Sequence, residues 1–249
     1  MKKRYFLDIS YRGTNYHGWQ MQKNALSIQQ IIEDCLGKLL GNETPVTASG
    51  RTDAGVHARQ QIAHFDAELQ ISLPELQRRM NGFLPLDIAI NSIVPVTEQG
   101  HARYTAYSRS YQYLIHQHKN PFLQDLSFFF WQELDVKKMN EAAEFLLGTH
   151  DFQCFSKANT DVKHYLCNIT EAKWEQQKNR LVFNITANRF LRGMVRAVVG
   201  TLLEVGKRNM DPAPMKDIIK SRDRSNAGKS APACGLYLTN VKYPIEIYL

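Results

Sequence analysis

The order of strand and helix patterns in the first half of the chain constrains the fold more than any other feature of the sequence. Residues 4–11 alternate between apolar and other side chains, which is the period of a strand with one buried face. The patterns that follow predict a helix at 28–40, a strand at 61–66, a helix capped at Ser72 and a strand at 87–96. We interpret this half as β-α-β-β-α-β, the order of a ferredoxin-like unit with both helices on one face of the sheet. The sequence therefore predicts the α+β class.

The first predicted helix has both a start signal and an apolar face. Ser27 and Gln30 form a capping-box pattern, in which each side chain can hydrogen-bond the backbone N–H of the other residue. Apolar residues then repeat at spacings of three and four. They are Ile28, Ile31, Ile32, Cys35, Leu36, Leu39 and Leu40.

The second half of the chain repeats the scheme of the first. Its patterns predict strands near 104–117, 127–133, 163–175 and 180–187, a helix at 136–147 and a long helix at 189–205. The boundary is expected between Gln99 and Tyr104, which gives two ferredoxin-like subdomains, 1–102 and 103–249. A cleft between two such units is a common place for a ligand site.

Composition favours a polyanionic partner and two modest cores. The chain has 249 residues, 43% of them hydrophobic, and 31 Lys and Arg against 24 Asp and Glu, a formal net charge of +7. Four widely separated cysteines show neither zinc-ligand nor disulfide spacing, so we expect free thiols. No apolar run reaches the length of a membrane span, and the first residues do not resemble a signal peptide. We expect a cytoplasmic protein.

The segment 50–58 crowds one carboxylate between small residues, a guanidinium and an imidazole. Asp53 lies two residues after Arg51 and four before His57, and glycine at 50 and 55 lets the backbone turn sharply. Such clusters are often built to perturb a pKa. An Asp followed by Gly is also typical of an ordinary connection between strands, and on composition alone both interpretations stay open.

Two basic regions follow in the second half. Arg189, Arg192 and Arg196 recur at spacings of three and four on the predicted helix, beside Gly193 and Gly200. An arginine row beside glycines can contact a phosphate chain closely. The segment 207–229 carries seven basic residues against three acidic ones, and it is a second candidate for phosphate contacts. For both regions, an ordinary solvated basic face is the alternative.

Five motifs, in order and spacing, resemble the TruA-type tRNA pseudouridine synthases over nearly the whole chain. They are the residues Tyr11, Gly13, Tyr16, Gly18, Trp19, Gln20 and Gln22; the run 50–58; Ala102-Arg103 with 110–113; Asn188 through Arg196; and 235–238. The resemblance implies two ferredoxin-like subdomains forming a joined antiparallel sheet with a central cleft, and a homodimer. It also implies isomerisation of uridine to pseudouridine at positions 38, 39 and 40 of the tRNA anticodon stem-loop.

The resemblance also assigns roles to four residues. Asp53 matches the catalytic aspartate, Tyr111 the active-site tyrosine and Arg196 the arginine of the family's helix, while Arg51 matches the residue implicated in stabilising the flipped nucleotide. Tyr111 offers a ring for stacking and a phenol for removal of the C5 proton. We expect Arg196 to form an ion pair with Asp53, because a dry pocket otherwise disfavours a charged carboxylate. The chemistry needs neither metal nor cofactor, so none is expected.

Several alternatives remain open at this level. The aspartate can act as a nucleophile at C1′ or as a base at the 2′ carbon. A noncatalytic RNA-binding module would also explain a ferredoxin-like sheet with basic edges, although it leaves Asp53 unexplained. A carboxylate hydrolase would need a second carboxylate, and none lies near Asp53 in the sequence. We expect structural roles for His57 and Trp19.

Overall fold

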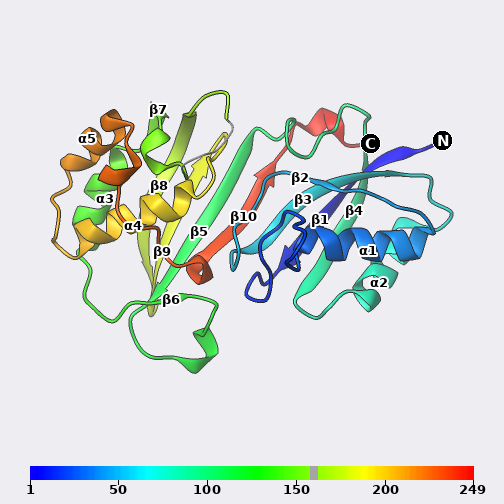
Figure 1. Ribbon diagram of the computed structural model, residues 1–249, viewed down its shortest axis with the longest axis horizontal. Coiled ribbons are helices and arrows are strands. Elements are labelled where there is room, and N and C mark those ends of the chain that lie inside the picture. Colours follow the sequence, from blue (N-terminus) through cyan, green and yellow to red (C-terminus); the bar gives the residue numbers. More distant parts are fainter. Residues whose placement is uncertain (158–161) are drawn as a thin grey trace. The chain divides into compact units, whose positions relative to one another are not determined.

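The computed structural model describes residues 1–157 and 162–249, and the chain packs as two compact units (Figure 1). Unit 1 contains Met1–Ser108 together with Leu238–Leu249, and unit 2 contains Arg109–Tyr237. Both units combine a sheet with α-helices, so the α+β class is confirmed. In the part of the chain that the structure describes, no helix is long and apolar enough to cross a membrane.

Unit 1 is built on β1, which lies between β3 and β4 and is antiparallel to both. Its elements in chain order are β1 Lys3–Tyr11, α1 Ile28–Leu40, β2 Thr47–Ala48, β3 His57–Ala67, α2 Leu73–Phe83 and β4 Ile88–Val96. The short strand β2 pairs with β3, and β10 (Leu236–Lys242) comes after β3 in the strand order. The predicted helices and strands of this half are confirmed. The β-α-β-β-α-β order requires one more strand, between α1 and β3, which no sequence pattern located. β2 is that strand, and its two residues are too few to show a period.

The helix caps in unit 1 use the residues expected from the sequence. The Ser27 side chain accepts a hydrogen bond from the Gln30 backbone N–H, at 3.3 Å, and Ser72 accepts one in the same way from Glu75. The first helix ends at Gly41, whose φ of 75° lies in the left-handed region that favours glycine. Local side chains therefore determine where these helices start and stop.

The C-terminal segment completes the core of unit 1. Phe6 is buried although its neighbours Tyr5 and Leu7 face the other side of β1. Its ring lies 4.8 Å from that of Tyr243 and 6.3 Å from that of Tyr248. The division expected from the sequence leaves these two tyrosines with the second half, because no local pattern marks a segment that returns to an earlier unit.

Unit 2 contains an antiparallel sheet in the order β5-β9-β8-β7, with β6 parallel to β5. Its elements are β5 Ser108–His116, β6 Phe128–Phe129, α3 Val136–Glu144, β7 Gly148–Asp151, β8 Leu166–Gln177, β9 Arg180–Ala187, α4 Met194–Gly206 and α5 Pro214–Ser221. Helix α3 packs against α4 and β8. Within the sheet Trp174 stacks on Phe183 with 5.0 Å between ring centroids.

The predicted helix at 189–205 begins five residues later than expected, at Met194. Gly193 adopts a φ of 73°, a left-handed conformation that cannot continue an α-helix, so residues 189–193 form the turn before it. Arg189 and Arg192 therefore do not share a helix face with Arg196, and the proposed arginine row was wrong. The spacing argument failed because it assumed helical backbone through this glycine.

Candidate active site

Asp53 lies in the connection between β2 and β3, on a loop whose backbone is fixed while its side chain stays half-exposed. The Val56 N–H donates to the Asp53 carbonyl oxygen at 3.1 Å, which closes a tight turn. Thr52 is buried beside it, and Arg51 is exposed. The turn thus leaves Asp53 part-exposed between the exposed Arg51 and the buried Val56.

The segment between β1 and α1 holds this loop from one side. The Trp19 N–H donates to the Thr52 carbonyl oxygen at 3.1 Å, and the Tyr11 hydroxyl lies 2.8 Å from the Thr52 hydroxyl. The Gly55 N–H donates to the Tyr16 carbonyl oxygen at 3.3 Å. Trp19 is buried, in agreement with the structural role expected for it.

Two glycines of this segment are required by close backbone approach. A Cβ atom at Gly13 would overlap the Val56 carbonyl oxygen, and one at Gly18 would overlap the Thr52 carbonyl oxygen. Gly18 also has a φ of 87°, where a side chain is strained. The glycines let the two backbones meet, so the motif that contains them shapes the aspartate loop.

His57 is fully buried and joins the same two segments. Its Nδ1 accepts a hydrogen bond from the Gly13 N–H at 3.0 Å, so this nitrogen carries no proton. A buried backbone donor without an acceptor costs about 1–3 kcal/mol. His57 therefore has the structural role expected from the sequence.

Two further polar residues support the loop and were missed by sequence reasoning. Gln61 is buried, accepts from the Ser49 hydroxyl and donates to the Gly50 carbonyl oxygen at 2.9 Å. Asp87 accepts a short hydrogen bond from the Tyr16 hydroxyl, and burial together with this bond raises the pKa of Tyr16. The inward-facing glutamine in β3 was the one available signal, since a buried amide in a strand needs partners.

Tyr111 and Tyr113 lie on the same face of β5 but differ in access. Tyr113 is fully buried, and its hydroxyl donates to the Pro232 carbonyl oxygen at 2.8 Å; burial raises its pKa. The Tyr111 ring is half-buried and meets Phe190 edge-on, with 5.1 Å between centroids. Of these two tyrosines, Tyr111 is the one that a ligand can reach.

Arg196 lies in the first turn of α4 and is tied to the segment that follows α5. Its Nε donates to the Ala231 carbonyl oxygen at 2.7 Å, and the Ala231 N–H donates to the Arg196 carbonyl oxygen at 2.9 Å. On the same helix a Cβ atom at Gly200 would overlap the Lys229 carbonyl oxygen. Gly200 therefore serves packing, and the idea that it opens the helix to phosphate was wrong.

Comparison with known proteins decides the family. A family model described as tRNA pseudouridine synthase matches residues 9–105 and 142–244. The chain belongs to this family.

Curated relatives named tRNA pseudouridine synthase A match this pseudouridine synthase over nearly their whole length. The protein from Porphyromonas gingivalis is 46% identical over 99% of both chains. The protein from Bacteroides fragilis is 44% identical over 99% of this chain and 98% of its own. The Bacillus pumilus protein is 40% identical, over 94% and 97% respectively. The chain is an isomerase, and the resemblance inferred from its motifs is confirmed.

The four predicted site residues of this pseudouridine synthase come from both units. Arg51 and Asp53 belong to unit 1, and Tyr111 and Arg196 belong to unit 2. The ion pair between Asp53 and Arg196 stays a prediction. Among the residues described, no group of His, Cys, Asp or Glu is arranged to hold a metal ion.

Part of the basic segment 207–229 of the pseudouridine synthase is paired with carboxylates outside it. Lys207 bonds Glu204 at 2.8 Å, Arg208 lies 3.7 Å from Asp135, and Arg222 lies 3.2 Å from Asp151. These contacts reduce the local charge excess that the sequence suggested. The cations of the last two pairs are exposed, and such pairs contribute little to stability.

Proposed function

We propose that this enzyme isomerises uridine to pseudouridine at positions 38, 39 and 40 in the anticodon stem-loop of tRNA, with Asp53 as the catalytic carboxylate. The observation that carries the proposal is the contrast at the aspartate loop, where Trp19 and Tyr16 bond the backbone and Tyr11 meets the Thr52 hydroxyl, while Asp53 itself remains half-exposed. Such preorganisation is what a catalytic group requires.

The reaction breaks the bond between C1′ of the ribose and N1, turns the base and joins C1′ to C5. The proton leaves C5 and a proton is gained at N1, so atoms balance without an added reactant. Asp53 acts either as a nucleophile at C1′ or as a base at the 2′ carbon, and both routes need a carboxylate that reaches the sugar. The half-exposed side chain meets that need.

Three further residues complete the proposed site. Tyr111 supplies a flat ring for the base and a phenol for the C5 proton, and its fixed place in β5 supports that role. Arg196, held by its bonds to Ala231, compensates the charge of Asp53. Arg51 stabilises the everted nucleotide, because eversion costs a few kcal/mol of lost stacking and pairing. Its exposure beside Asp53 in the loop supports this assignment.

The fold and assembly of the enzyme complete the proposal. The strand order β4-β1-β3-β2 in unit 1, with α1 and α2 in the two crossovers, supports a ferredoxin-like plan for that unit. We extend the plan to unit 2, where β5, α3, β8, β9 and α4 follow one another. The resemblance further suggests a cytoplasmic homodimer.

The direct test is to incubate the purified protein with unmodified tRNA transcripts and to map pseudouridine by mass spectrometry. Isomerised nucleosides are expected at positions 38–40 only, and transcripts with cytidine at all three positions should yield none. Pseudouridine outside the anticodon stem-loop would contradict the proposed substrate site. Absence of any pseudouridine across several transcripts would contradict the proposed activity.

Tyr111→Phe is expected to lower kcat by roughly 100-fold, because it removes a general acid–base group and keeps the ring. The fold should be unaffected, since the Tyr111 ring contact with Phe190 is retained. Single-turnover rates and thermal unfolding check both points.

Tyr113→Phe is the matched control, because it removes a hydroxyl from the same strand face. It deletes the buried bond to the Pro232 carbonyl oxygen and should cost about 1 kcal/mol of stability. The rate of isomerisation should stay near that of the unchanged enzyme. A Tyr111→Phe enzyme with an unchanged kcat would limit Tyr111 to stacking.

A further inference from the structure

Trp131 is an exposed tryptophan in a chain that buries its other two. Its exposed fraction is 72%, against 2% for Trp19 and 1% for Trp174. An indole is costly to leave in water, and exposed aromatics beside polar groups often mark binding sites. No role follows for Trp131 from the aspartate loop or from the predicted site residues.

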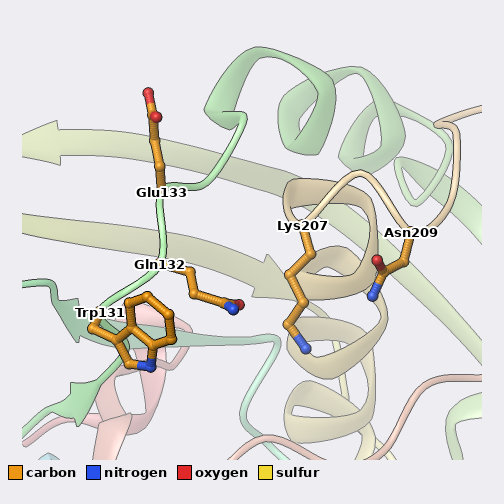
Figure 2. A pocket seen from close by; sticks show the side chains of 5 residues that line it. All are labelled: Trp131, Gln132, Glu133, Lys207 and Asn209. Carbon is orange, nitrogen blue, oxygen red and sulfur yellow. The ribbon is translucent and has the colours of Figure 1, made fainter.

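The indole borders a recess of about 400 Å³ in unit 2 (Figure 2). This volume lies within the roughly 300–1,000 Å³ of sites that hold small ligands. The recess is lined by Trp131, Gln132, Glu133, Lys207 and Asn209. The first three follow β6 in the chain, and the last two follow the end of α4. Its lining is therefore an aromatic ring, two amides and one charge of each sign.

Glu204 orients the two residues on the α4 side. It accepts from the Lys207 ammonium at 2.8 Å and from the Asn209 side-chain amide at 2.9 Å. These hydrogen bonds hold the pKa of Glu204 below its ordinary value. Because Asn209 donates through its amide nitrogen, its amide oxygen is the acceptor that this side chain can still offer. Lys207 retains further N–H groups as donors.

The opposite side of the recess offers an uncommitted amide. The Gln132 side chain makes no hydrogen bond to any residue in 1–157 or 162–249. Figure 2 shows the Gln132 side chain extending toward Lys207, while Glu133 points away from both. The Gln132 amide, the Asn209 amide and the Lys207 ammonium thus line the recess together with an open aromatic ring.

We infer that this recess binds one unpaired nucleotide of the RNA substrate, with its base stacked on Trp131. Aromatic stacking with amide contacts to a base edge is how proteins hold unpaired RNA bases, and Lys207 suits the adjoining phosphate. The polar lining does not fit an apolar protein surface, and the formal net charge of +7 suits a polyanion. The inference rests on the proposed function for its choice of RNA, but the recess can be tested without turnover.

The burial of Trp19 and Trp174 makes fluorescence a direct test. Tryptophan emission of the full chain is titrated with unmodified tRNA transcript, and acrylamide quenching is measured with and without RNA. We expect RNA to change the emission and to protect it from acrylamide. Trp131→Phe should remove both effects, because the two tryptophans that remain are buried.

Kinetics with the same variants separate this subsite from catalysis. Trp131→Ala should raise KM roughly tenfold with kcat unchanged, in line with about 1–3 kcal/mol per stacked base, and Trp131→Phe should recover most of the affinity. Phe83→Ala removes another exposed aromatic, from the end of α2, and should change neither constant.

Three outcomes decide between the possibilities. Unchanged Trp131 emission at saturating RNA, in an enzyme that forms pseudouridine, would overturn the subsite and leave the proposed function intact. An RNA-dependent change in emission without any pseudouridine formation would support the subsite and contradict the function. Without RNA, protection of the Trp131 emission from acrylamide that grows with protein concentration would overturn the subsite, because a second copy of the chain then covers the recess.

Discussion

Asp53→Asn is expected to lower pseudouridine formation by at least roughly 1,000-fold, because the substitution removes the group that attacks or deprotonates the sugar. The fold should be kept, since asparagine leaves in place the contacts of the Thr52 and Asp53 backbone and of the Thr52 hydroxyl. Binding of tRNA should persist. Single-turnover assays with a transcript, combined with a binding titration, measure both quantities.

Asp66→Asn is the control for this experiment. Asp66 is an exposed carboxylate of the same unit, and it forms an ion pair with Arg4 at 2.8 Å. Loss of this carboxylate should leave the rate of pseudouridine formation unchanged and should cost little stability. An Asp53→Asn enzyme that still makes pseudouridine at an undiminished rate would rule out the carboxylate mechanism.

Gly13→Ala should reduce kcat/KM by roughly 100-fold or more, although Gly13 has no chemical group to contribute. The added methyl group would overlap the Val56 carbonyl oxygen, so either the end of β1 or the aspartate loop must move. A displacement of about 1 Å at a catalytic group costs on the order of 100-fold in rate. The bond from the Gly13 N–H to His57 would be strained as well.

Gly82→Ala provides a comparison in helix α2, where an added Cβ atom meets nothing within 4 Å. It should keep full activity and raise stability by roughly 0.5–1 kcal/mol, because alanine favours the helix more than glycine does. Thermal unfolding and steady-state kinetics of both variants would be compared. Native-like kinetics for Gly13→Ala would show that the loop tolerates movement and would refute its proposed rigidity.

Sequence patterns were reliable where structure is determined locally. The helix at 28–40 follows from its apolar spacing and its serine cap, and both are present in the structure. The strand at 180–187 likewise matches β9. Errors arose where one residue overrides a pattern, as when Gly193 starts α4 later than the spacing indicated. They also arose where packing decides, as when Gly200 proved to accommodate Lys229.

The residues of the candidate site were likewise predictable only in part. The segment 50–58 pointed to Asp53 because unusual residues are adjacent in the chain. The sequence held only an indirect signal for Gln61 and none for Asp87, because each acts through side chains that meet only in the folded chain. Trp131 was overlooked for a related reason. It falls in the strand predicted at 127–133, where an aromatic residue is usually core, whereas in the structure β6 ends at Phe129 and Trp131 is exposed.

The return of residues 238–249 to unit 1 has a consequence for biosynthesis. A ribosome makes Phe6 early, but Tyr243 and Tyr248, which cover it, emerge only after all of unit 2 has been translated. The first unit therefore cannot finish its interior before unit 2 has been made. Synthesis of residues 238–249, rather than of the first hundred or so residues, therefore sets the earliest moment at which the aspartate-bearing unit can reach its native packing.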